Sequence, residues 1–159
     1  MKVLKKIINV LMTLIIAIGG LFLVLYFLGI VPYVVLSGSM EPTIKTGSLC
    51  FVNKNISIDK IKEKDIIAFK LDDGTLVTHR VKSITEEGII TKGDSNKKAD
   101  NNVVTKINYV GKDMLWIPKL GYMVMIFRTT NGKIIFLSCI AVLFICGILF
   151  GDDTKKTEK

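Results

Sequence analysis

The sequence predicts a mainly β domain of about 100 residues flanked by two transmembrane α-helices. Two long uncharged apolar runs lie near the ends of the 159-residue chain, at 7–30 and 134–150. Between them, short apolar stretches alternate with turn-forming residues. Half of the residues are hydrophobic, the mean hydropathy is +0.47 and the net charge is +8. This composition excludes an acidic disordered chain and argues against a wholly soluble globule.

The first run, 7–30, predicts a transmembrane helix. Its 24 residues carry no charge and would extend about 36 Å as a helix, enough to cross a hydrocarbon core with some tilt. Three lysines precede it within residues 1–6. A cleaved signal peptide also begins with basic residues, but its apolar region is shorter and a small-x-small cleavage site follows it. We therefore expect a retained signal-anchor.

The second run, 134–150, predicts a second transmembrane helix. It is uncharged, but 17 residues is the short end of a spanning length; a buried core helix or an interfacial helix is the alternative. Basic residues flank both runs at the chain ends, which favours cytoplasmic termini at 1–6 and 151–159. The segment 31–133 is then extracytoplasmic, in a multi-pass protein of the cell membrane whose first partner is the lipid bilayer.

The segment between the runs carries the signals of antiparallel strands. Asp73-Gly74 and Glu87-Gly88 each separate two short apolar stretches, as hairpin turns do. Residues 75–84 between those turns are expected to form a strand that presents alternate side chains to opposite faces. His79 and Arg80 would then point in opposite directions.

The composition also limits the kinds of site. Three cysteines cannot close into a complete disulfide set, and Cys139 and Cys146 lie in an apolar run. His79 is the single histidine, so a multi-histidine metal site is excluded. Basic residues are not interleaved with aromatic ones as in many nucleic-acid-binding surfaces. We expect no metal, no cofactor and no nucleic-acid partner.

Three separated places carry groups that could perform chemistry: Ser37-Gly38-Ser39, His79, and the stretch from Lys92-Gly93-Asp94 to Asp100. Each is unremarkable alone, because turn serines, single histidines and loop aspartates are usually structural. Together they match the needs of acyl transfer: a hydroxyl nucleophile, an imidazole that takes its proton, and a carboxylate that orients the imidazole. Backbone N–H groups around Gly38 and Ser39 are candidate oxyanion donors.

These motifs resemble those of type I signal peptidases. SGSMEPT after an N-terminal apolar run, then THRV, then TKGD, follow the order of that family's boxes over about residues 35–100. The larger bacterial branch has a lysine where this chain has His79. Histidine at this place resembles the endoplasmic-reticulum and archaeal branch, which also occurs in some Gram-positive bacteria.

The resemblance implies a role for each matching residue. Ser39 would be the nucleophile, His79 the general base, and Asp100 the acid that orients the histidine. Ser37 would support the oxyanion hole and Asp94 would hold the loop. Two alternatives stay open: Asp94 in place of Asp100 as third member of the triad, and Lys92 as the base.

The chain departs from the family pattern at two places. The family often has Gly-Asp after the serine box, and here Ser48 follows Gly47. It also often has Gly-Asp before the Ile-Ile-x-Phe strand, and here Lys64 replaces that glycine. Neither departure touches the expected triad.

The resemblance implies a signal-peptidase-like β-fold, with 31–133 as a serine peptidase domain that removes N-terminal signal peptides from exported preproteins. Preproteins would be its substrates and the export channel a candidate partner. One alternative is the same chemistry dedicated to a few surface, pilus or matrix proteins. Another is a non-catalytic membrane subunit, in which the fold persists without the reaction.

Overall fold

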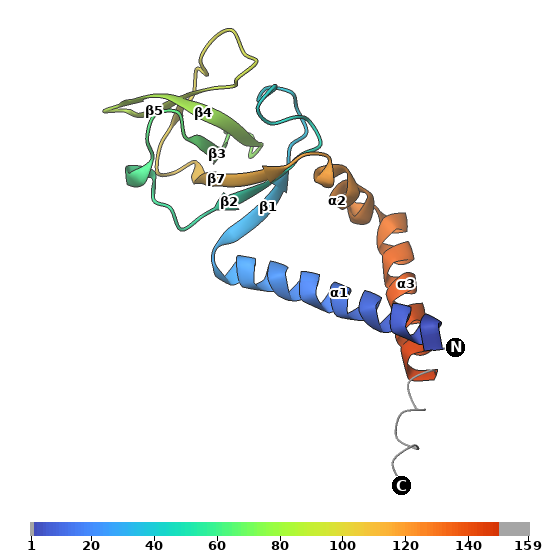
Figure 1. Ribbon diagram of the computed structural model, residues 1–159. Coiled ribbons are helices and arrows are strands. Elements are labelled where there is room, and N and C mark those ends of the chain that lie inside the picture. The colour runs from blue at the N-terminus through green and yellow to red at the C-terminus, as the bar shows by residue number, and fades with distance from the viewer. Residues whose placement is uncertain (1, 150–159) are drawn as a thin grey trace. The chain divides into compact units, whose positions relative to one another are not determined.

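The computed structural model describes residues 2–149, and the chain divides into two compact units. Residues 25–125 form one unit, and the segments 2–24 and 126–149 form the other. Figure 1 shows the sheet of the first unit and the helices of the second. The expected tail 151–159 and Phe150, the last residue of the second expected span, lie outside the described residues.

Helix α1 (Lys2–Phe27) contains the first expected span. Within residues 2–149 it includes the single helix that is by itself long and apolar enough to cross a membrane, Lys5–Phe27. The helix ends three residues earlier than the apolar run. Gly29 takes a left-handed φ of +69°, as glycines at helix ends commonly do, and its N–H donates to the Tyr26 carbonyl at 3.0 Å. Ile30 therefore already belongs to strand β1.

The second apolar run lies in α3 (Thr130–Leu149), which follows α2 (Leu120–Arg128). The axes of α2 and α3 differ by 93° across a short break, and only the two taken together have the length and apolar composition of a span. The structure therefore does not show a second transmembrane helix at 134–150, and this second span stays a prediction.

A seven-stranded antiparallel sheet forms the body of residues 25–125, in the order β1-β2-β7-β3-β4-β5-β6. The prediction of a mainly β domain is confirmed. The strands are β1 (Ile30–Val34), β2 (Leu49–Asn53), β3 (Ile66–Lys70), β4 (Leu76–Thr85), β5 (Gly88–Lys92), β6 (Val103–Val104) and β7 (Tyr109–Ile117), with a short 3-10 helix η1 (Ile58–Lys60) before β3.

Both predicted hairpins are confirmed. Asp73-Gly74 connects β3 to β4, and Gly74 takes the positive φ of 81° that the tight turn requires. Glu87-Gly88 connects β4 to β5. The first of these turns sets the register of β3 with β4, which pairs Ile67 with His79 and Ile66 with Arg80. Because neighbouring residues of a strand point to opposite faces, His79 and Arg80 lie on opposite sides of the sheet.

Apolar side chains gather in two clusters, which the registers of β3 and β4 assign to opposite faces. One cluster lies on the face of His79 and comprises Ile61, Ile67, Phe69, Val81, Ile89 and Val104. The other lies on the face of Arg80 and comprises Met40, Ile44, Cys50 and Ile66. Full burial of each such side chain stabilises the fold by roughly 1.5–3 kcal/mol. The second cluster has a consequence for the site, because Met40 and Ile44 belong to the loop that carries Ser39.

Candidate active site

The structure brings Ser39, His79 and Asp100 together from three separate segments. Ser39 Oγ lies 3.0 Å from His79 Nε2, and His79 Nδ1 lies 2.6 Å from Asp100 Oδ2. An ionised carboxylate can only accept, so Nδ1 carries the proton and donates to Asp100. Nε2 is then the acceptor for the Ser39 hydroxyl. This hydrogen-bonded array of hydroxyl, imidazole and carboxylate is the arrangement that can activate a serine.

His79 is held by the middle of β4. Its side chain is nearly buried, and the ring stands edge-on to Phe69 with centroids 6.2 Å apart. The pairing of β4 with β3 on one side and β5 on the other fixes its backbone. The imidazole therefore has little rotational freedom, which keeps Nε2 directed at Ser39.

Ser39 lies in the loop between β1 and β2, which is held by buried side chains on one side and by hydrogen bonds on the other. Met40, its neighbour, is 1% exposed and Ile44 is fully buried. On the other side, the Ser95 N–H donates to the Ser39 carbonyl and the Ser95 hydroxyl to the Gly38 carbonyl, both at 2.9 Å. The position of Ser39 thus depends on Ser95, which the sequence did not single out.

The close approach of these two loops requires Gly93. A Cβ added at this position would lie 2.6 Å from the Ser39 carbonyl oxygen, closer than real Cβ contacts come. The glycine of the TKGD motif therefore lets the 93–95 turn pack directly on the loop that carries Ser39.

Asp100 is oriented by Thr91 on β5. The Thr91 hydroxyl donates to Asp100 Oδ2 at 2.6 Å, and the Asp100 N–H donates to the Thr91 carbonyl at 2.9 Å. One carboxylate oxygen therefore accepts from both the histidine and the threonine. Thr91 is fully buried. Thr91 begins the TKGD motif, but the motif alone did not indicate this role, because the contact with Asp100 depends on where β5 places the threonine.

Asp94 binds Arg80 and does not contact the imidazole. Arg80 Nε and Nη2 donate to the two Asp94 oxygens at 2.8 and 2.7 Å, and Nη1 donates to the Lys64 carbonyl at 3.0 Å. The guanidinium lowers the pKa of Asp94, and the carboxylate in turn raises the pKa of Arg80. This bidentate pair ties β4 to the turn that follows β5.

Of the other residues that the sequence suggested, Ser37 lies beside Ser39 and Lys92 lies away from His79. Ser37 Oγ lies 3.3 Å from Ser39 Oγ, at the edge of the site. Lys92 pairs with Arg80 across β4 and β5, which places it on the face opposite His79. Within residues 2–149, no group of three or more His, Cys, Asp or Glu side chains could hold a metal ion.

A third carboxylate, that of Asp113 on β7, is buried away from the triad. Neither of its oxygens has a hydrogen-bond partner of ordinary geometry within the described residues. Burial raises the pKa of Asp113 to about 6, although the Thr78 hydroxyl and the Cys50 thiol lie close enough to limit the rise. Burial raises the pKa of the Cys50 thiol as well, with the Asp113 charge as a further cause.

Comparison with known sequences gives a family match over most of the chain. The family described as "Signal peptidase, peptidase S26" matches residues 6–117. Signal peptidase I W of Bacillus subtilis (strain 168) is 44% identical over 78 residues, which are 46% of this chain and 41% of that protein.

Two eukaryotic relatives are also similar. The signal peptidase complex catalytic subunit SEC11C of Homo sapiens is 33% identical over 106 residues, 58% of this chain and 55% of that protein. The signal peptidase complex catalytic subunit SEC11 of Colletotrichum graminicola is 32% identical over 102 residues, 56% and 59% of the two chains. The chain thus spans about half the length of the curated relatives it matches.

Proposed function

The chain belongs to the signal peptidase family, peptidase S26, and from this premise we propose that it is a membrane-bound serine endopeptidase that removes N-terminal signal peptides from exported preproteins. The observation that carries the proposal is the hydrogen-bonded array Ser39–His79–Asp100. The earlier resemblance to type I signal peptidases of the histidine branch is supported by relatives that include both a bacterial enzyme and eukaryotic catalytic subunits.

In the first half of the reaction, Ser39 Oγ attacks the carbonyl carbon of the scissile bond while His79 Nε2 takes the hydroxyl proton. Asp100 stabilises the imidazolium through Nδ1–H. The carbonyl oxygen becomes an oxyanion, for which the Ser39 N–H and the Ser37 hydroxyl are the nearest candidate donors. The Ser39 N–H donates no backbone hydrogen bond within residues 2–149, so it is available for this role.

The intermediate then expels the amine of the mature protein, which receives the proton from His79 Nε2. The signal peptide is left as an ester on Ser39 Oγ. In the second half, His79 takes a proton from water, the resulting hydroxide attacks the ester carbonyl, and Ser39 Oγ leaves with the proton returned by His79. The products are the free signal peptide and the unchanged enzyme, so no cofactor is consumed.

The membrane arrangement is part of the proposal. α1 supplies an apolar helix near the N-terminus, and the run 134–150 would supply a second span. Basic residues at both ends then favour cytoplasmic termini and an extracytoplasmic domain over 31–133. Preproteins are the substrates, the bilayer holds the enzyme, and the export channel is a candidate partner. The relatives named as subunits of a signal peptidase complex make assembly with further subunits a second candidate arrangement.

The test is preprotein processing in membranes that carry the full chain or one of three variants. We expect Ser39→Ala and His79→Ala to slow release of the mature protein by at least about 10³-fold, because each removes a member of the catalytic unit. Ser83→Ala, which removes a hydroxyl from the same strand as His79 but outside the site, is the matched control. Blotting checks that all variants are equally abundant. Wild-type processing by Ser39→Ala would overturn the catalytic proposal in favour of a subunit without chemistry.

A further inference from the structure

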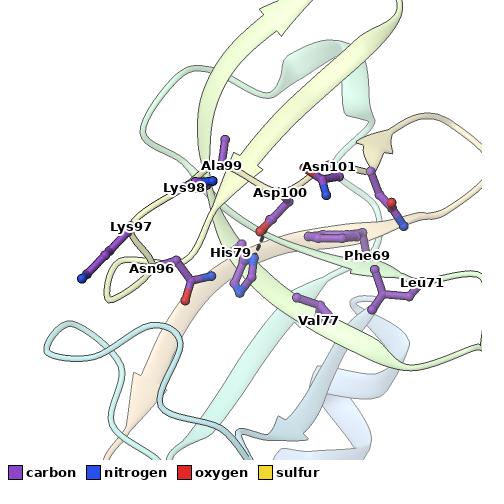
Figure 2. A pocket seen from close by; sticks show the side chains of 11 residues that line it. Phe69, Leu71, Val77, His79, Asn96, Lys97, Lys98, Ala99, Asp100 and Asn101 are labelled. Atoms are coloured by element: carbon purple, nitrogen blue, oxygen red, sulfur yellow. Dashed lines mark hydrogen bonds and ion pairs between the residues drawn. The ribbon is translucent and has the colours of Figure 1, made fainter.

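An open cavity of about 580 Å³ lies against the His79–Asp100 pair (Figure 2). We call it the His79 cavity. Its walls come from the ends of β3 and β4 around their hairpin and from the segment 96–102. The volume is within the range of sites that hold small ligands or a few peptide residues. Because two triad members line it, anything bound there touches the reacting centre.

The walls of the His79 cavity are of two kinds. Phe69, Leu71 and Val77 supply an apolar side, which Figure 2 shows next to the imidazole. The segment 96–102 supplies a polar rim that includes Lys97 and Lys98, both exposed. The carboxylate in the lining, Asp100, is already bonded to His79 and Thr91. Against the two lysine charges of the rim the lining holds one carboxylate, that of Asp100, so the lining carries a net positive charge.

In the proposed reaction, the part of the substrate before the scissile bond must lie near Ser39, and the part after it must lie near His79. The acyl half must place its carbonyl oxygen at the Ser39 N–H and the Ser37 hydroxyl, and neither serine lines the His79 cavity. The leaving half must place its nitrogen at His79 Nε2, which protonates it. The residues that follow the scissile bond therefore pass over the imidazole, where the cavity begins.

We propose that the His79 cavity binds the first residues after the scissile bond, and that Lys97 and Lys98 make it select an acidic side chain there. This inference rests on the proposed peptidase function and adds a preference on the mature side of the substrate. The apolar wall accepts the aliphatic part of a side chain, and the lysines attract a carboxylate at its end. Such charge complementarity at an exposed rim contributes mainly to selectivity.

The experiment uses the full chain in detergent micelles and three peptide substrates. All share one signal-peptide segment and differ only at the second residue after the scissile bond, which is Glu, Gln or Lys. The enzymes are the wild type, Lys97→Glu/Lys98→Glu, and a control, Lys60→Glu/Lys62→Glu. The control reverses two exposed lysine charges that do not line the cavity. The readout is kcat/KM for each peptide, with the Gln peptide as the measure of intact catalysis.

We expect the wild type and the control to cleave the Glu peptide about three- to tenfold faster than the Lys peptide, as one or two exposed ion pairs would allow. In Lys97→Glu/Lys98→Glu the ratio should invert, with the Gln peptide still cleaved at a rate between those of the other two. Molar salt should bring all ratios towards one, because it screens exposed charges.

Two results would count against the inference in distinguishable ways. Normal cleavage of the Gln peptide together with a Glu-to-Lys ratio that is the same in wild type and in Lys97→Glu/Lys98→Glu would overturn the inference alone. Failure of the wild type to cleave the Gln peptide in a Ser39-dependent manner would overturn the peptidase function and the inference with it.

Discussion

Asp94 and Asp100 lie six residues apart in one loop and bind consecutive residues of one strand, yet their surroundings differ in kind. Asp94 accepts two hydrogen bonds from Arg80, one on each oxygen. Asp100 accepts from His79 and Thr91, both on the same oxygen. Because His79 and Arg80 point to opposite faces of β4, the loop contacts side chains on both faces of the strand.

The difference shows that the partner of a carboxylate determines whether it is suited to a structural or a catalytic role. A guanidinium is permanently charged and forked, so the Arg80–Asp94 pair is a fixed cross-link whose value lies in holding the loop. An imidazole can gain and lose a proton near neutral pH, so a carboxylate beside it stabilises a charge that forms only during a reaction. Asp94 is thus suited to structure and Asp100 to catalysis, although both belong to the same motif.

The largest expected effect is that of Asp100→Asn. An amide can donate to His79 Nδ1, which would move the ring proton to Nε2 and remove the acceptor for the Ser39 hydroxyl. We expect kcat/KM on a signal-peptide substrate to fall by about 10⁴-fold, with the thermal unfolding midpoint in detergent little changed. A variant that keeps more than a tenth of wild-type activity would show that Asp100 does not orient the base.

Asp94→Asn tests the other half of the comparison. Loss of the charge should lower the free energy of unfolding by about 1–3 kcal/mol while kcat/KM stays within about tenfold of wild type. The exposed Asp72→Asn is the control. Chemical denaturation measures the difference.

The sign of the pH dependence follows from the lowered pKa of Asp94. Its contribution is present above the unfolded-state value of about 4 and is lost as pH falls through the lower folded-state pKa. The gap between wild type and Asp94→Asn should therefore close in strong acid. A gap that persists there would mean that the charge pair is not its source.

Asp113 extends the comparison to a carboxylate with neither kind of partner. Its pKa of about 6 lies above the unfolded value of 3.8, so the folded state binds the proton more tightly. The free energy of unfolding of the wild type should then decline by about 2–3 kcal/mol as pH rises from about 4 to 6, and stay level above that. Asp113→Asn should remove this decline, as measured by denaturation across that range. Parallel curves for the two proteins would contradict the assignment.

The smallest expected effect concerns Lys64, whose carbonyl accepts from Arg80. Lys64 has φ +72°, a left-handed conformation that a glycine adopts without strain. Lys64→Gly should raise the free energy of unfolding by about 0.5–1 kcal/mol without changing activity. Lys62→Gly, at a nearby exposed position without positive φ, should be neutral or destabilising. The opposite order of the two variants would show that the Lys64 backbone is not strained.

Local pattern was sufficient for the general architecture and for naming the candidate residues. Alternation and turn residues predicted the β domain and both hairpins, because these depend on neighbours in sequence. The first apolar run predicted α1, but its end at Phe27 was missed, since Gly29 could begin a turn or continue the run. The motifs SGSM, THRV and TKGD indicated Ser39, His79 and two candidate aspartates.

The supporting residues could not be recognised in this way. Thr91 and Arg80 lie in the motifs TKGD and THRV, and Ser95 directly follows TKGD, yet their roles appear only when the pairing of β4 with β5 and the close approach of the two loops give them partners. The choice between Asp94 and Asp100 was open for the same reason. A side chain's direction at a motif depends on loop geometry, which spacing along the chain does not specify.

The sequence by itself determined the family, the β-rich domain, the apolar helix near the N-terminus and the chemical types at the site. All of these follow from residue identity and short-range periodicity. Only the tertiary structure decided that Asp100 contacts His79 while Asp94 contacts Arg80, that Ser95 holds the Ser39 loop, and that a cavity with a basic rim adjoins the imidazole. The hydrogen bonds among them join residues 14 to 57 positions apart, and such contacts exist only once the sheet has formed.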